Sequence, residues 1–225
     1  MDVLEAIEAR KSIKAYKPDP VPLDLLKKIV GQALHAPSWG NTQPWEFAVA
    51  GGRKLKGIQE AFVKRWGEKN REEAKPDVGR PYVFPMPYKT YTRDHMALER
   101  TFLAEADVKN RDVDNFRNYG APACIYLLIR RAFVYQTKGV NVWPLYDCGA
   151  AVQNILLSAT AYGLGTVPQA RSVIYPDIIR EALGIPEDRL IVLAIAIGYP
   201  DWDKQRNKMR STRQPLEKVA TFYGF

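Results

Sequence analysis

Residues 146–170 read YDCGAAVQNILLSATAYGLGTVPQA, and this segment sets the architecture of the chain. Residues 146–162 hold one charged side chain, Asp147, and predict a long helix. A helix that is apolar on nearly every side is stable only when it is buried, so the rest of the fold must pack around it. Gly163-Leu164-Gly165 ends the helix, because glycine adopts the left-handed conformation of a C-cap. Residues 166–170 then predict a strand or a loop.

Strands are predicted on both sides of this helix. Residues 124–129 and 190–197 are continuous apolar runs, as expected for strands covered on both faces. Residues 45–50 have the composition of a third strand and end at two glycines. Apolar spacing predicts further helices over residues 2–11, 24–34, 53–64 and 176–183, the first of them capped by Asp2. The chain therefore combines few strands with many helices.

The middle of the chain, from about 67 to 119, breaks this pattern. Prolines interrupt an aromatic-rich stretch, and one helix is predicted over residues 94–108. The prolines are Pro76, Pro81, Pro85 and Pro87, and the aromatic residues include Tyr82, Phe84, Tyr88 and Tyr91. We interpret this segment as an excursion from the core fold, either a lid over a site or padding at a subunit interface. The whole chain, 1–225, is then one domain, since a domain usually holds about 100–200 residues.

The chain carries a formal net charge of +8 and a pI near 9.4, so it attracts anions. Candidates are nucleic acid, a membrane surface, a phosphate-bearing cofactor and an acidic substrate. The charge is spread along the sequence without a Lys/Arg block or a nucleic-acid motif, which disfavours nucleic acid. No apolar run reaches about 18 residues and no secretory signal is visible. We therefore expect a cytoplasmic protein with no nucleic-acid or membrane partner.

The sequence lacks the motifs of several common binding and catalytic sites. Cys124 and Cys148 lie in apolar surroundings with no Cys-x-x-Cys, which predicts buried thiols rather than a thiol redox pair or a metal site. No Gly-x-Gly-x-x-Gly follows a strand and no P-loop is present, so the ordinary dinucleotide and nucleotide triphosphate cradles are absent. His35 and His95 have no obvious acidic partner in the sequence, and we assign neither a catalytic role.

Three polar segments are candidate binding elements. Residues 10–14, RKSIK, gather three cations and a hydroxyl, which suits a phosphate clamp, although cations at a helix end also complement its dipole. Residues 36–45, APSWGNTQPW, form a polar loop whose amides and hydroxyls suit a polyol or a heterocycle. Residues 208–217, KMRSTRQPLE, form a basic tail in which Lys208 and Arg210 point to one side if the segment is extended.

In this order, the segments resemble the nitroreductase family of flavoproteins. The family pattern opens with Arg-(Arg/His)-Ser-x-(Arg/Lys) and continues with an Ala-Pro-Ser-x-x-Asn-x-Gln-Pro-Trp loop. Later come Gln-Asn-(apolar) in a central helix, Gly-Leu-Gly, and Lys-x-Arg near the C-terminus. The chain has these motifs at residues 10–14, 36–45, 153–155, 163–165 and 208–210. The resemblance implies an α+β nitroreductase-like fold, in which helices flank a central, mainly antiparallel sheet and two chains form an intertwined homodimer.

The resemblance also implies FMN as the cofactor and assigns residues to it. The phosphate would be held by Arg10, Lys11, Ser12, Lys208 and Arg210. Lys14 would lie near the ribityl chain and the N1/O2 edge, where positive charge stabilises reduced flavin. The flavin of the other subunit would be reached by Pro37, Ser38, Trp39 and Asn41, with Gln43 in support. The isoalloxazine would be faced by Pro168, Gln169 and Ala170, with backbone N–H groups aimed at N5.

Two departures from the family pattern stand out. Lys11 and Lys14 keep positive charge where arginine occurs in relatives but lose its bidentate geometry. The segment after Pro168 lacks a glutamate that some relatives have.

The implied activity is an FMN-dependent NAD(P)H oxidoreductase that works by ping-pong on small electron-poor acceptors such as nitroaromatics or quinones. NADH and NADPH are not distinguished by the sequence. The basic charge favours a carboxylated acceptor such as a nitrobenzoate. Reductive dehalogenation and an oxygen-using reaction on the same fold remain alternatives. So does a non-enzymatic flavin-binding or basic interaction protein.

Overall fold

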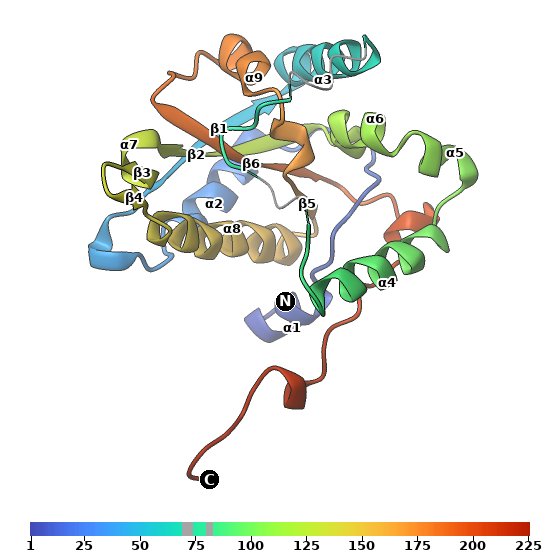
Figure 1. Ribbon diagram of the computed structural model, residues 1–225. Coiled ribbons are helices and arrows are strands. Elements are labelled where there is room, and N and C mark those ends of the chain that lie inside the picture. Colours follow the sequence, from blue (N-terminus) through green and yellow to red (C-terminus); the bar gives the residue numbers. More distant parts are fainter. Residues whose placement is uncertain (69–73, 80–82) are drawn as a thin grey trace.

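A four-stranded antiparallel sheet forms the centre of the computed structural model, which describes residues 1–68, 74–79 and 83–225 (Figure 1). Across the sheet the order is β1 (Trp45–Gly51), β2 (Ala123–Arg130), β6 (Arg189–Gly198) and β5 (Gly165–Gln169). The register pairs Trp45 with Ile129, Ala123 with Ile197, and Gly165 with Gly198. A separate two-stranded ribbon consists of β3 (Tyr135–Gln136) and β4 (Gly139–Val140). The expected α+β architecture with an antiparallel sheet is confirmed.

Helices cover both faces of the sheet (Figure 1). One layer consists of α2 (Leu23–Ala33) and α8 (Trp143–Ala161), and the other of α3 (Gly52–Gly67) and α9 (Pro176–Leu183). The β2 strand supplies both cores: Ile125, Leu127 and Ile129 belong to the α2/α8 side, and Cys124, Tyr126 and Leu128 to the α3/α9 side. Because both faces are covered, the strand reads as a continuous apolar run.

Helix α8 fulfils the main expectation from the sequence. It begins at Trp143, earlier than predicted, because Pro144 is tolerated in the first turn of a helix. Ala151, Ile155 and Ala159 are fully buried in it. It ends before Gly163, whose φ of +77° is the left-handed conformation expected of the residue after a helix.

Helix α1 (Val3–Ala9) is shorter than predicted. Its capping box is present, since the Asp2 carboxylate accepts from the backbone N–H of Glu5 and the Glu5 carboxylate accepts from that of Asp2. Arg10 is already the C-cap, with ψ of 125°, and residues 11–14 continue as extended chain. The alternative interpretation, that the cations of residues 10–14 complement a helix dipole, is therefore wrong for most of this segment.

The middle of the chain is helical rather than irregular. It forms α4 (Tyr88–Arg100), α5 (Glu105–Lys109) and α6 (Arg111–Phe116). The predicted single helix over 94–108 is wrong at both ends. Pro87 sits outside the helix, at the N-cap of α4, and the helical turns stop at Thr101 before a new N-cap at Ala104. Pro81, Tyr82 and residues 69–73 lie outside the described residues.

The remaining elements are short. They are η1 (Trp39–Asn41), η3 (Asn118–Gly120), α7 (Arg131–Val134), η4 (Arg171–Val173), η5 (Gln205–Asn207) and η6 (Leu216–Lys218). Both cysteines are buried and free, as expected. Within the described ranges no helix is long and apolar enough to cross a membrane, and no group of His, Cys, Asp and Glu side chains is arranged for a metal ion.

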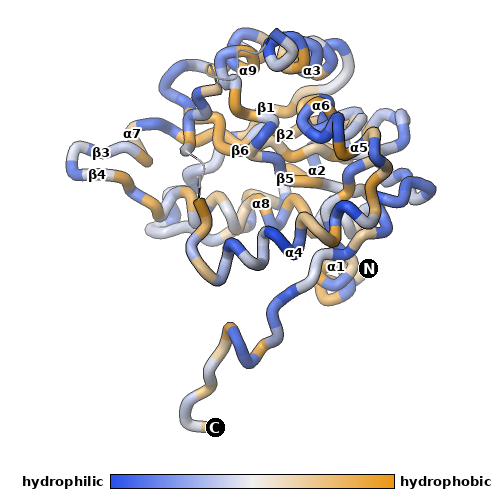
Figure 2. Tube along the Cα trace, turned by 45° about the vertical axis from the view of Figure 1, so that its right-hand side comes forward, coloured by the Kyte–Doolittle hydropathy of each residue, from blue (hydrophilic) through white to orange (hydrophobic). Residues whose placement is uncertain are grey.

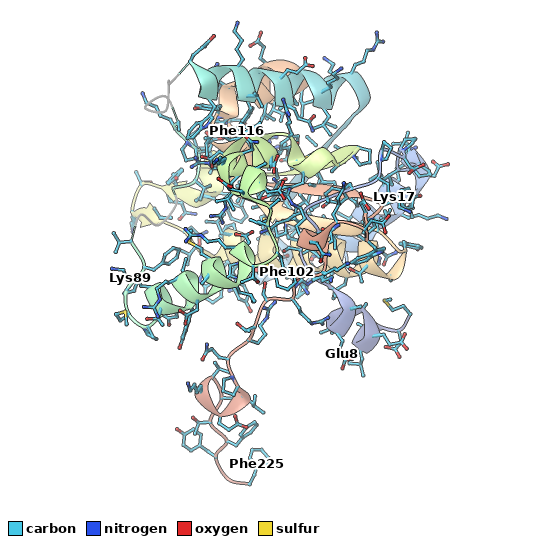
Figure 3. The ribbon with its side chains drawn as sticks, turned by 90° about the vertical axis from the view of Figure 1, so that its right-hand side faces the viewer. Glu8, Lys17, Lys89, Phe102, Phe116 and Phe225 are labelled. Carbon is cyan, nitrogen blue, oxygen red and sulfur yellow. The ribbon has the colours of Figure 1, made fainter. Side chains whose placement is uncertain are left out.

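The C-terminal tail leaves the body of the molecule (Figure 2). Figure 3 shows Phe225 at its far end, well away from Phe102 and Phe116 in the body. Apolar side chains are exposed along it, at Leu216, Val219, Phe222, Tyr223 and Phe225. Exposure of several large apolar side chains in water is unfavourable, and here they gather along one short segment.

Candidate cofactor site

The basic segment after α1 runs along the edge of the sheet. Ser12 forms a parallel bridge with Thr166, and the Ile13 N–H donates to the Thr166 carbonyl at 3.0 Å. Gly165 makes this approach possible, because a Cβ there would meet Ile13 Cγ1 at 2.5 Å. The Gly-Leu-Gly motif thus has two separate roles: Gly163 ends α8, and Gly165 admits the basic segment beside β5.

Asn207 joins the basic segment to the C-terminal segment. Its side chain is fully buried, and its Oδ1 accepts from the Lys14 N–H at 2.8 Å. Its Nδ2 donates to the carbonyls of Ala15 at 2.7 Å and Asp201 at 2.8 Å. This residue was missed in the sequence, where an asparagine in a basic tail gives no signal. It fixes the start of residues 208–213 against residues 10–14, although the two segments are almost 200 positions apart in the chain.

A cluster of positive charge results from this junction. Partial burial lowers the pKa of Arg10, and the charges of Arg213 and Arg210 lower it further. Burial likewise lowers the pKa of Lys11, with a further contribution from Arg210. In the part of the chain that the structure describes, none of these side chains forms an ion pair with a carboxylate. Like charges held together without counter-ions are an anion-binding arrangement, and a phosphate group fits it.

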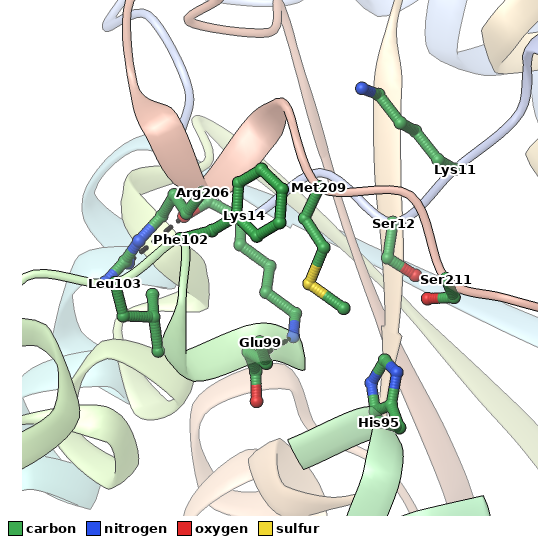
Figure 4. Close-up of a pocket in the computed structure, with 10 residues that line it drawn as sticks. All are labelled: Lys11, Ser12, Lys14, His95, Glu99, Phe102, Leu103, Arg206, Met209 and Ser211. Atoms are coloured by element: carbon green, nitrogen blue, oxygen red, sulfur yellow. Dashed lines mark hydrogen bonds and ion pairs between the residues drawn. The ribbon is translucent and has the colours of Figure 1, made fainter. Parts of the chain in front are cut away.

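Arg213 is a second residue that the sequence did not single out. It follows Lys208 and Arg210 in the same segment and contributes its charge to the surroundings of Arg10. Its guanidinium is held by the carbonyls of Ser211, at 3.3 Å, and Thr212, at 2.9 Å. Lys11, in contrast, turns its Nζ over the ring of Trp202, 5.0 Å from the centroid. Figure 4 shows this amine pointing away from the other polar groups.

A pocket opens beside the cluster (Figure 4). It has a volume of about 70 Å³ and is lined by Lys11, Ser12, Lys14, His95, Glu99, Phe102, Leu103, Arg206, Met209 and Ser211. A larger hollow of about 710 Å³ shares Lys14, Phe102, Leu103 and Arg206 with it. Helix α4 therefore forms one wall of this pocket.

Lys14 has a counter-ion on that wall. Its Nζ bonds to the Glu99 carboxylate (Figure 4), and Arg111 Nη2 lies 2.9 Å from the other carboxylate oxygen. Glu99 is only 6% exposed. Burial acts to raise the pKa of Glu99, but the hydrogen bond and charge of Lys14, together with Arg111 and His95, outweigh it and hold this pKa below its ordinary value. Glu99 is thus a buried, ionised carboxylate within a basic pocket.

The end of β5 is held by a polar network. Pro168 and Ala170 are exposed, whereas the Gln169 side chain is buried. Its Oε1 accepts from Asn118 Nδ2 at 3.0 Å, and its Nε2 donates to Asn115 Oδ1 at 2.9 Å. The Gln169 side chain therefore anchors the end of the strand between two exposed residues.

Asn115 and Asn118 were not singled out from the sequence. Asn118 and Tyr119 adopt φ of +50° and +54°, in the left-handed region that asparagine tolerates and tyrosine seldom adopts. Burial raises the pKa of Tyr119 to about 12, and the Tyr119 hydroxyl accepts from Asn115 Nδ2 at 2.6 Å. The Asn-Tyr-Gly sequence before β2 was the available signal for this turn.

The polar loop at residues 36–45 lies elsewhere. The Trp39 N–H donates to Asp147 Oδ2 at 3.0 Å, which places the loop at the beginning of α8, whereas the basic segment lies beyond its end. The helix separates the two by about 21 Å, since Asp147 and the last residue of α8, Ala161, are 14 positions apart at about 1.5 Å per residue. The loop is locally fixed, since the Gln43 N–H donates to Ser38 Oγ at 3.0 Å and Asn41 and Gln43 have positive φ. Pro37, Ser38, Trp39, Asn41 and Gln43 are therefore not brought to the cation cluster of their own chain.

Comparison with known proteins agrees with this geometry. A model of the nitroreductase family matches residues 7–199, and the chain belongs to this family. It is 30% identical to the 4-nitrobenzoate reductase of Nocardioides sp. (strain LMS-CY), over 99% of this chain and 92% of that protein. It is 28% identical to Nitroreductase NfnB of Mycolicibacterium smegmatis (strain ATCC 700084 / mc(2)155), over 96% of this chain and 90% of that protein.

Solved structures give the same result. The FMN and NADPH-dependent nitroreductase NfnB from sphigopyxis sp. strain HMH superposes with a TM-score of 0.89 at 27% identity and full coverage of both chains. The FMN-dependent nitroreductase NfnB from Mycobacterium smegmatis, solved in complex with NADPH, has a TM-score of 0.86 at 26% identity, with 98% of this chain and 99% of that chain covered. The family and the nitroreductase-like fold expected from the sequence are confirmed.

Proposed function

We propose that this chain is an FMN-dependent NAD(P)H oxidoreductase that reduces small electron-poor acceptors, nitroaromatics above all. The observation that carries the proposal is the uncompensated cation cluster of Arg10, Lys11, Arg210 and Arg213, which two distant segments form at the edge of the sheet. The relatives named as FMN-dependent nitroreductases share this fold over the whole chain. A protein that used its positive charge only for non-specific interaction would not need Asn207 to join the two basic segments through buried hydrogen bonds.

Different residues would bind different parts of the cofactor. Arg10, Ser12, Lys208 and Arg210, with Lys11 and Arg213 beside them, would hold the phosphate through charge-assisted hydrogen bonds. Lys14 would supply positive charge near the ring, and the backbone of residues 168–170, fixed by the Gln169 anchor, would line it. FMN itself, when bound, would take the electrons of NADH or NADPH and pass them to the acceptor. The chain's own task is therefore to bind, orient and exclude water.

Nitrobenzoate is the acceptor to test first. The pocket is basic, and the relative in Nocardioides is a 4-nitrobenzoate reductase. Purified protein with FMN should oxidise NADH or NADPH in a manner that depends on 4-nitrobenzoate, and chromatography should show reduced nitrogen products. Product analysis with a halogenated aromatic compound and with oxygen, each in place of the nitro compound, separates the dehalogenase and oxygen-using alternatives. No turnover with any acceptor, despite bound FMN, would favour a non-enzymatic flavin-binding protein.

We further propose that the enzyme is a homodimer of one-domain chains and that each cofactor site is shared. Two observations support this. The loop at residues 36–45 lies about 21 Å along α8 from the basic segment of its own chain, so a second chain is needed to bring the two together. Large apolar side chains are also exposed on α1, α8 and the tail, including Ile7, Trp143, Tyr146 and Phe225. Sedimentation equilibrium should give the mass of two chains.

A further inference from the structure

Glu99 is a buried carboxylate in a pocket that otherwise gathers positive charge. Its side chain is 7% exposed, and both of its oxygens are used: one by Lys14 and the other by Arg111, at 2.9 Å. A carboxylate in such a place is stable only because two cations face it. Helix α4 brings it there, and His95, one turn earlier on the same helix, lines the same pocket.

The three charged groups differ in what they touch. Lys14 belongs to the segment beside β5, its backbone is held by Asn207, and it lines the pocket with Ser12 and Ser211. Arg111 opens α6, and its side chain is 46% exposed. The Lys14–Glu99–Arg111 triad thus carries a net charge of +1 in place of the +2 that the two cations alone would provide. Of these three charged groups, Lys14 is the one that belongs to the cofactor segment.

We infer that Glu99 is a positioning residue that holds Lys14 and sets how much positive charge the flavin ring meets, and so tunes the reduction potential of bound FMN. This inference rests on the proposed function, since it places FMN beside Lys14. Two-electron reduction adds negative charge to the ring, and nearby positive charge stabilises the reduced form relative to the oxidised form. A carboxylate bonded to Lys14 opposes that effect and keeps the potential lower than a free lysine would.

The test is the midpoint potential of FMN in the holoenzyme, measured by anaerobic reduction against a reference dye. Glu99→Gln keeps the shape of the side chain and removes its charge, so it should raise the potential. A tenfold gain in the affinity for reduced over oxidised FMN corresponds to about 30 mV for a two-electron couple. Arg111→Gln leaves Glu99 with less compensation and should lower the potential. The matched control is Glu105→Gln on α5, whose exposed carboxylate pairs with Lys109, at 2.7 Å, and which should leave the potential unchanged.

Opposite signs for the two variants separate tuning from a structural role, because a loosened site would shift both potentials in the same direction. Arg111→Gln also keeps the test intact if Glu99→Gln does not fold, since Arg111 is half exposed. Action through Lys14 is tested in a Lys14→Met background, where the shift caused by Glu99→Gln should fall to less than half. An equal shift in both backgrounds, or none in either variant, overturns the inference. A wild-type protein that takes up no FMN instead contradicts the proposed function itself.

Discussion

At the scale of single residues, cations that form no ion pair among the described residues shape the site as much as hydrogen-bonded side chains do. The charges of Arg213 and Arg210 act against the charge of Arg10, and burial adds to the cost of the Arg10 charge. Such a site stores unfavourable electrostatic energy until an anion binds, and it marks where function and stability oppose each other.

Arg210→Met should therefore lower the affinity for FMN without lowering the stability of the apoprotein. Loss of a charge-assisted contact with a phosphate predicts a fall in affinity of about tenfold to a hundredfold. Lys11→Met should lower the affinity for FMN by less than about threefold. The Lys11 amine lies over the ring of Trp202, so its charge is already engaged in a cation–π contact. Fluorescence titration with FMN and urea unfolding of the apoprotein measure both quantities. An Arg210→Met apoprotein that is clearly less stable than the wild type would show that the cluster has a structural role.

Asn207 presents the opposite case, a residue with every polar atom satisfied. Asn207→Ala removes three buried hydrogen bonds and leaves the Lys14 N–H and two carbonyls without their partner. We expect the free energy of unfolding to fall by about 3 kcal/mol and FMN affinity to fall with it. Asn154→Ala is the control, because that side chain makes one long bond of 3.4 Å, to the Gln32 carbonyl. Equal unfolding free energies for the two variants would contradict this account of Asn207.

At the scale of elements, the approach of the basic segment to β5 is the most demanding contact. Gly165→Ala would place a methyl group 2.5 Å from Ile13 Cγ1 and 2.9 Å from Pro200 Cγ. We expect a loss of about 1–3 kcal/mol in stability, because overpacking forces the backbone apart. FMN affinity should fall as well, since the segment carries Arg10 and Ser12. Gly57→Ala in α3 meets no atom within 4 Å and should be neutral or slightly stabilising. Urea unfolding compares the two, and similar losses from both would contradict the close approach.

The elements differ in how well the sequence predicted them. Helix α8 and strands β2 and β6 were predictable because covering both faces of a strand, or all sides of a helix, demands continuous apolar residues. The first turns of helix α4 were not, since they hold exposed tyrosines and lysine and follow a proline-rich stretch. Glu99 could not be found at all, because only the packing of α4 against residues 10–14 brings it to Lys14.

The candidate site likewise contains residues that the sequence predicted and residues that it did not. Residues 10–14 and 208–210 were expected together through the family resemblance, and the structure brings them together. Asn207 and Arg213 were missed because a basic tail is usually a solvated end and a single asparagine has no pattern. At residues 168–170 the backbone N–H groups were predicted to face the flavin, and the Gln169 side chain is buried in a network with Asn115 and Asn118. That network connects residues more than 50 positions apart, which no local pattern reveals.

At the scale of the whole molecule, the proposed shared site makes a second chain part of the chemistry. In a shared site, Arg10→Ala and Asn41→Ala damage different halves of each site. Co-expressed, the two variants should form mixed dimers in which one site carries both changes and the other carries neither. About a quarter of wild-type activity should return, because half of the dimers are mixed and each has one intact site of two. Activity no higher than the average of the separate variants would contradict sharing.

The most direct measurement is the visible absorption spectrum of the purified protein supplied with FMN, followed anaerobically through addition of NADH and then NADPH. We predict a bound-flavin spectrum that bleaches with at least one donor and recovers when a nitroaromatic compound is added. The donor that bleaches it names the physiological reductant class. A protein that remains colourless and retains no FMN after gel filtration would contradict the central claim, and the cation cluster at Arg10 and Arg210 would then need another anion.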